Sequence, residues 1–179
     1  MSVKKEGVYE KAKDEMRLSE RILAELPGFR GYKEKELRRE SDRLIRNHLY
    51  MKMSQAKNAL KEVFQQLSDK RLHEVLTDMD RLLAKFDAVA EKINHASYGY
   101  AGFFNVLKVE EEKLDSMIAF DNQLIDNVVQ ILEEAKVFKA EVMKQKVDKT
   151  REHIQKLRGM LESLEETFDE RQEVILGVK

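Results

Sequence analysis

The chain has 179 residues and no cysteine, and its 33 Lys and Arg against 34 Asp and Glu give a net charge of −1. This balance argues against a globally basic nucleic-acid binder, and a chain without cysteine has no disulfide, thiolate metal ligand or cysteine nucleophile. No apolar run approaches the ~20 residues that span a membrane, and the N-terminal residues lack the apolar core of a signal peptide. We therefore expect a cytoplasmic protein made of one domain, or of one domain and an extension.

Helical spacing of apolar residues predicts two helices in the first part of the chain. The first runs from about Val3 to Glu25, and Pro27 with Gly28 ends it because proline cannot continue the hydrogen-bond ladder. The second runs from about Lys33 to Leu67. Its apolar residues step by four and three, the heptad spacing of packed helices: Leu49, Met53, Ala56, Leu60, Val63 and Leu67.

Two further helices follow with the same spacing. Ser68 and Asp69 offer an N-cap for the third helix, which steps without a fault through Leu72, Val75, Met79, Leu82, Phe86, Val89 and Ile93. The fourth helix begins near Val109 and is acidic, with eight Asp or Glu against two Lys in residues 108–134. Residues 28–52 carry eight Lys or Arg against four Asp or Glu. These opposite charges favour the second and fourth helices as neighbours.

The C-terminal part of the chain leaves two arrangements open. Residues 134–142 contain no Pro, Gly, Asn or Ser, which predicts a helix that continues from Val109 to about Gln172, with an insert or a bend near Phe138. Such a helix would be ~96 Å long and would project as a coiled coil, whereas a turn would fold it back. The chain thus divides into a helical bundle, residues 1–137, and a coiled-coil extension or fifth helix, residues 138–179.

The predicted fold class is all-α: an antiparallel up-down helical bundle with a long C-terminal coiled-coil helix. The apolar seam of residues 147–168 needs cover from the same chain or from a second copy. The segment is basic at its start and acidic at its end, so antiparallel pairing would bring opposite charges together. We expect a homodimer formed in this way.

Two glycine-containing loops interrupt the helical pattern, LPGFRGY at residues 26–32 and SYGYAGFF at residues 97–104. In an up-down bundle both loops lie at the same end. Their aromatic side chains either close that end of the core or form a surface for a ligand or partner. The candidate surface residues are Phe29, Arg30, Tyr32, His95, Tyr98, Tyr100, Phe103 and Phe104.

The two loops also carry a resemblance. With LPGFRGYKEKELRRE and YGYAGFF, the chain resembles a group of uncharacterised prokaryotic all-helical proteins with paired aromatic loops. The similarity covers the chain from residue 26 to residue 135. The resemblance implies an all-helical fold, and it brings no activity and no functional residues with it.

Asp121 lies at a seam position of the fourth helix where an apolar residue is expected. It either points to solvent or is a buried carboxylate, and a buried carboxylate needs a partner. Counted from the loop end, Arg43, Arg46 and His48 of the second helix lie at the same depth. We therefore predict a buried polar pair of Asp121 and Arg46 that fixes the register between these two helices.

No metal or cofactor site is predicted, because the four histidines lack the Glu-x-x-His pairs of di-metal carboxylate sites in helical bundles. We expect a non-enzymatic helical scaffold or interaction protein that acts through coiled-coil association and the aromatic loop surface. Its partner would be a protein or a second copy, and not a nucleic acid. Two alternatives stay open: a membrane-surface helical protein that uses its basic segments, and a small-ligand-binding module at the loop end.

Overall fold

The computed structural model describes residues 20–22, 26, 35–96 and 111–176, and these residues contain helices and turns but no strand. Four long helices make up most of them: α2 (Lys35–Asp69), α3 (His73–His95), α4 (Glu111–Met143) and α5 (Thr150–Leu176). Ile22 and Leu26 are buried against the same core. The all-α prediction is confirmed for the described part of the chain.

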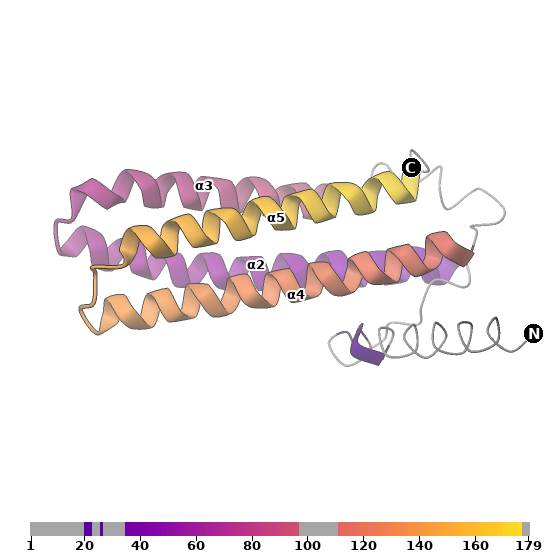
Figure 1. Ribbon diagram of the computed structural model, residues 1–179, viewed down its shortest axis with the longest axis horizontal. Helices are drawn as coiled ribbons and strands as arrows, with labels where there is room; N and C mark the ends of the chain where they lie inside the picture. The colour runs from indigo at the N-terminus through magenta and orange to yellow at the C-terminus, as the bar shows by residue number, and fades with distance from the viewer. Residues whose placement is uncertain (1–19, 23–25, 27–34, 97–110, 177–179) are drawn as a thin grey trace, which may run out of the picture.

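Each long helix packs against two others. α2 packs against α3 and α4, and α5 packs against the same two helices, so α2 and α5 lie on a diagonal (Figure 1). The second and fourth helices are therefore neighbours, as their opposite charges predicted. Turns at residues 70–72 and 144–149 join α2 to α3 and α4 to α5. Both turns lie at the left of Figure 1, and we call this the turn end.

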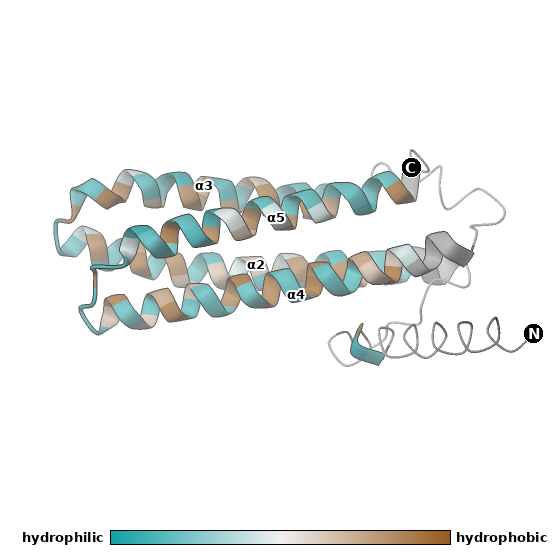
Figure 2. Cartoon of the chain, in the orientation of Figure 1, coloured by the Kyte–Doolittle hydropathy of each residue, from teal (hydrophilic) through white to brown (hydrophobic). Residues whose placement is uncertain are grey.

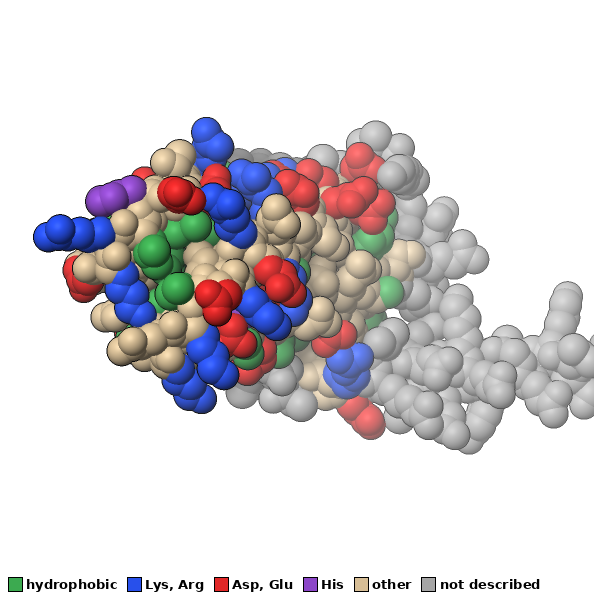
Figure 3. Space-filling view, turned by 60° about the vertical axis from the view of Figure 1, so that its left-hand side comes forward, with side chains coloured by type: hydrophobic (Ala, Val, Ile, Leu, Met, Phe, Trp, Pro, Cys, Tyr) green, Lys and Arg blue, Asp and Glu red, His purple; other side chains and the backbone are tan. Residues whose placement is uncertain are grey.

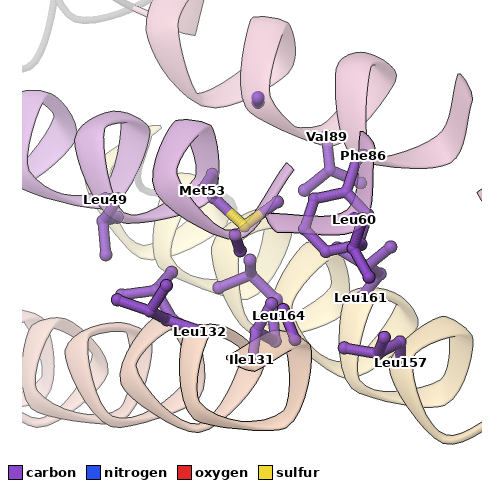
Figure 4. Close-up of a cluster of buried hydrophobic side chains, with 14 of the residues drawn as sticks. Leu49, Met53, Leu60, Phe86, Val89, Ile131, Leu132, Leu157, Leu161 and Leu164 are labelled. Carbon is purple, nitrogen blue, oxygen red and sulfur yellow. The ribbon is translucent and has the colours of Figure 1, made fainter. Parts of the chain in front are cut away.

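The core follows from the heptad spacing of the four helices. In Figure 2 apolar residues recur along each helix among hydrophilic ones, and in Figure 4 their side chains meet between the helices. Leu60 of α2, Phe86 of α3, Ile131 of α4 and Leu161 of α5 are all fully buried there. Each such side chain stabilises the fold by ~1.5–3 kcal/mol, so this seam is the main source of stability.

The turn after α2 is closed by backbone hydrogen bonds of the Schellman type. The N–H of Leu72 donates to the Leu67 carbonyl at 3.1 Å, and the N–H of Arg71 donates to the Ser68 carbonyl at 2.9 Å. Arg71 has a φ of 58°, the left-handed conformation that glycine usually supplies at this position. Ser68 thus lies inside α2, and α3 begins at His73 without the predicted side-chain N-cap.

The turn after α4 shows that the prediction of one continuous C-terminal helix is wrong. α4 ends at Met143, and the N–H groups of Gln145 and Lys146 donate to the carbonyls of Val142 and Glu141 at 3.0 and 2.9 Å. Gln145 has a φ of 64°. The sequence predicted a helix here because no glycine or proline marks the turn. Glutamine instead takes the left-handed conformation, at a cost of ~1–2 kcal/mol.

α5 folds back along α3 and α4, so the chain itself covers the seam of residues 147–168. Five of its apolar residues are at most 5% exposed: Ile154, Leu157, Leu161, Leu164 and Phe168. The border predicted between residues 137 and 138 lies inside α4. The homodimer was predicted from an uncovered seam, and that reason no longer holds. Self-association stays a prediction that needs a different surface.

Candidate functional site

Four charged side chains lie in the core toward the end of the helices opposite the turns. Asp42 and Arg46 come from α2, Asp121 from α4 and Arg171 from α5, and their exposed fractions are 2%, 9%, 0% and 0%. Charged side chains are almost never buried this deeply unless they are paired. We call these four residues the charged layer and treat it as the candidate functional site.

Arg171 lies at the centre of the charged layer. Its Nε donates to Asp121 Oδ1 at 2.5 Å, and its Nη1 donates to Asp42 Oδ1 at 2.9 Å. The contact with Asp42 crosses the diagonal between α5 and α2. The other Asp42 oxygen accepts from Arg46 Nε at 2.8 Å, and Arg46 Nη1 donates to the Asn94 backbone carbonyl of α3 at 3.2 Å. All four helices therefore contribute a group to this network.

The heptad spacing explains why these residues meet. Three of them lie one heptad from a buried apolar residue of their own helix: Leu49 for Asp42, Val128 for Asp121 and Leu164 for Arg171. α2 and α4 begin, and α5 ends, away from the turn end, so the three positions come to a similar depth. Sequence reasoning missed Arg171. The signal was present, because the seam of α5 steps from Leu164 to Phe168 to Arg171 by four and three.

Asp121 is fully buried, which is the second of the two interpretations that its position allowed. Its carboxylate accepts a hydrogen bond from Arg171 of α5. Arg46 donates to Asp42 on its own helix. The two members of the predicted pair thus belong to one network but are joined through Arg171 and Asp42. The physical reason is that the long Arg171 side chain reaches the space between α2 and α4 from α5.

The charged layer balances its own charges, with two guanidinium groups against two carboxylates. Arginine stays protonated in proteins, and its planar group donates in fixed directions that suit carboxylate oxygens. Taking such ions out of water costs several kcal/mol each, and their mutual contacts offset this cost. The layer therefore joins helices, and its carboxylates face arginine side chains of the same chain.

A second polar group lies nearer the turn end, between α4 and α5. His153 is 9% exposed, with Nδ1 2.6 Å from Glu134 Oε1 and Nε2 3.1 Å from Glu141 Oε2. Its ring stacks on Phe138, with the ring centroids 4.8 Å apart. Lys156 donates to the other oxygen of Glu134 at 2.5 Å. We call Glu134, Glu141, His153 and Lys156 the His153 cluster.

The pKa values of Glu134, Glu141 and Lys156 shift toward the charged forms. Burial alone would raise the pKa of the Glu134 carboxyl, but hydrogen bonds from Lys156 and His153 outweigh burial and hold it below its ordinary 4.5. The hydrogen bond from His153 also lowers the pKa of Glu141. The hydrogen bond to Glu134 raises the pKa of Lys156 above its ordinary 10.5. The cluster is thus held together mainly by opposite charges.

Most of the predicted loop surface lies outside the described residues, namely Phe29, Arg30, Tyr32, Tyr98, Tyr100, Phe103 and Phe104. His95, the remaining member, is the last residue of α3 and is exposed. Its Nε2 lies 2.9 Å from Glu91 Oε2, one helical turn earlier. The loop surface therefore stays a prediction.

Within the ranges that the structure describes, no group of three or more His, Cys, Asp or Glu could hold a metal ion. None of the described helices is both long enough and apolar enough to cross a membrane. Comparison of the chain with protein-family models, with curated proteins and with solved structures found no match. The family resemblance of the two glycine loops stays a prediction as well.

Proposed function

We propose that this protein is a non-enzymatic helical scaffold that holds one rigid shape and presents it to a protein partner, which includes a second copy of the chain. The charged layer is the observation that carries the proposal. It takes hydrogen-bonding groups from α2, α3, α4 and α5 and joins them in one buried network. A network of this kind is suited to fixing how the four helices lie against one another.

An apolar heptad core specifies the register of helices weakly, because sliding a helix by seven residues again brings apolar residues together. The charged layer supports one register, since Arg171 of α5 donates to Asp42 of α2 and to Asp121 of α4 at the same time. Such a network costs stability relative to an apolar core of the same shape. The network lowers stability but favours a single helix register, and a protein that works by presenting a fixed surface needs a single register.

Ion pairs on the outside of the helices favour the same arrangement. Lys92 of α3 contacts Glu165 and Asp169 of α5 at 3.2 and 2.7 Å, and Lys139 of α4 contacts Glu62 of α2 at 2.6 Å. Each pair contributes only ~0–1 kcal/mol because its members are partly exposed. A helix that slid along its axis would lose these pairs together with the charged layer.

The test replaces the charged layer with apolar side chains in one chain, as Asp42→Leu, Arg46→Met, Asp121→Leu and Arg171→Met. Replacing a buried ionic network in this way often leaves stability equal or higher, so we expect the variant to fold. We also expect several helix registers, seen as extra or broadened amide signals in NMR spectra. In cell extract, the variant should lose the proteins that cross-linking captures with the unaltered chain.

A matched control changes four exposed charges of the same kinds: Lys61→Gln, Asp80→Asn, Arg81→Gln and Glu133→Gln. This control should keep the spectrum and the captured proteins of the unaltered chain. The scaffold proposal fails if the layer variant folds with a single set of amide signals and captures the same proteins.

A further inference from the structure

The two turns form a hollow at the turn end. It has a volume of about 480 Å³ and is lined by residues of both turns and of the helix starts that follow them. Leu72, Val75 and Val147 line it, and all three are partly buried against the core. Figure 3 shows hydrophobic side chains on this part of the surface, with Lys and Arg side chains on several sides of them. We call this feature the turn-end hollow.

The surroundings of the turn-end hollow are basic. Five exposed cations belong to its lining or to the turn beside it: Arg71, Lys144, Lys146, Lys149 and Arg151. Two acids also line it, Asp148 and Glu74, and Arg151 holds Glu74 at 3.3 Å. The two turns themselves, residues 70–72 and 144–149, contain five Lys or Arg and one Asp. This part of the molecule is positive although the whole chain is slightly negative.

The C-terminal end of α5 is acidic, so its charge is opposite to that of the turns beside the hollow. Residues 162–174 contain six Asp or Glu and one Arg. Glu165 and Asp169 contact Lys92 of α3. Three other acids are exposed and lie four residues apart along one line of the helix, and the partly buried Val174 continues that line. We call these four residues the acidic stripe: Glu162, Glu166, Glu170 and Val174.

We propose that the turn-end hollow binds the acidic stripe of a second copy of this chain. The carboxylates pair with the cations of the rim, and Val174 contacts the apolar floor. A copy cannot fill its own hollow, because Thr150 and Glu170 lie ~30 Å apart along α5. Two antiparallel copies can fill each other's hollows, which closes the pair with twofold symmetry. This inference rests on the proposed scaffold function and names its partner.

Sedimentation velocity of the full-length chain tests the docking. At about 0.1 M salt, where the screening length is about 10 Å, we expect the average mass to rise with concentration toward that of a dimer. At about 1 M salt the screening length is about 3 Å, and the association should weaken roughly tenfold or more because the paired charges are exposed. A chain that stays monomeric up to about 1 mM at the lower salt overturns the proposal.

Charge reversal identifies the two surfaces. One variant carries Arg71→Glu with Lys149→Glu in the rim, and the other carries Glu166→Lys with Glu170→Lys in the stripe. All four side chains are exposed, so we expect both variants to fold, which circular dichroism checks. Each variant alone should stay monomeric. An equimolar mixture should form mixed dimers, because each rim then meets a stripe of opposite charge.

The control, Lys61→Glu with Lys136→Glu, makes the same change in net charge as the rim variant, but on the sides of α2 and α4, and should associate like the unaltered chain. A mixture of the two folded reversal variants that stays monomeric overturns the proposal. Such a failure is distinguishable from a failure of the scaffold function. The scaffold test measures helix register and the captured proteins, whereas this test measures the mass of the assembly in solution.

Discussion

At the turn end, apolar side chains fill the space between the helices, and the His153 cluster lies at the edge between α4 and α5. Toward the other end, the charged layer occupies the centre, and Arg171 contacts carboxylates of α2 and α4. The two groups differ in their partners. The charged layer pairs its carboxylates with arginine, whereas the His153 cluster uses histidine and a lysine whose side chain is 57% exposed.

This difference shows that the position of a polar group, in the centre or at the edge of the helix packing, decides how the protein responds when a partner is lost. In the His153 cluster, Glu134 and His153 are buried, but Glu141 and Lys156 keep access to water, which can replace a lost partner at small cost. A group in the centre has no such replacement, so a lost partner leaves an unpaired buried charge. We therefore expect the charged layer to respond strongly to substitution, and the His153 cluster to respond mainly to pH.

Arg171→Leu should produce the largest effect, because it removes a hydrogen-bonding partner from each of the buried carboxylates of Asp42 and Asp121. We expect the free energy of unfolding, measured by urea denaturation, to fall by about 3–5 kcal/mol. Arg158→Leu removes an exposed arginine from the same helix and should change this free energy by about 0.5 kcal/mol or less. Equal losses in the two variants would show that the centre and the surface do not differ in this way.

Glu134→Gln tests the His153 cluster. The lowered pKa of Glu134 means that its contacts stabilise the fold above its ordinary pKa of 4.5 and are lost as the pH falls through the lowered value. We expect the variant to be about 1 kcal/mol less stable near neutral pH. Its stability should also fall less steeply than that of the unaltered chain as the solution is acidified below pH 4.5.

The measurement is urea denaturation across this pH range. Glu162→Gln removes a carboxyl from the exposed face of α5 and serves as the control. If Glu134→Gln and the unaltered chain lose stability in parallel as the pH falls, the hydrogen bonds of the His153 cluster are not what holds this carboxyl in its charged form.

Gln145→Gly tests the turn that joins α4 to α5 and so brings the residues of the His153 cluster together. Glycine adopts the left-handed conformation of residue 145 without steric cost, so we expect a gain of about 0.5–1 kcal/mol in the thermal or urea unfolding free energy. Gln145→Ala keeps a Cβ and should give no such gain. A loss of stability on Gln145→Gly would mean that the glutamine side chain, and not the backbone, stabilises the turn.

Gly159→Ala is expected to have an effect as small as that of Gln145→Gly, and it calibrates the comparison. Gly159 lies within α5, between the two polar groups, and a Cβ added there meets nothing within 4 Å. Alanine should therefore raise the free energy of unfolding by about 0.5–1 kcal/mol, through helix propensity alone, which thermal denaturation measures as a higher melting temperature. No gain would indicate that α5 is not an ordinary exposed helix at this position.

The apolar spacing was sufficient to predict α2, α3 and most of the buried faces, but it predicted α4 and α5 as one helix. The residues of α3 from Met79 to Ile93 are the clearest case, since every seam position is buried. Helix ends were less predictable. The turn at Gln145 has no sequence signal, because its left-handed residue is a glutamine whose conformation depends on the packing of α5 against α3 and α4.

The candidate site was predictable in part. Asp121 attracted notice because it interrupts an apolar seam, which is a local signal. Its partner could not be chosen from local spacing, because Arg171 lies 50 residues away and reaches Asp42 across a diagonal of the helix packing. Charged residues at seam positions of three helices are a usable signal, but matching them requires the fold-back of α5 to be known.

The double-mutant cycle between Asp121 and Arg171 tests most directly the claim that the charged layer holds the helices through its buried charges. Urea denaturation compares the unaltered chain, Asp121→Leu, Arg171→Leu and the double variant. We predict that the double variant loses about 2–3 kcal/mol less than the sum of the single losses, because each single variant leaves a buried charge that the other substitution removes. Losses that add to within about 0.5 kcal/mol would contradict the account.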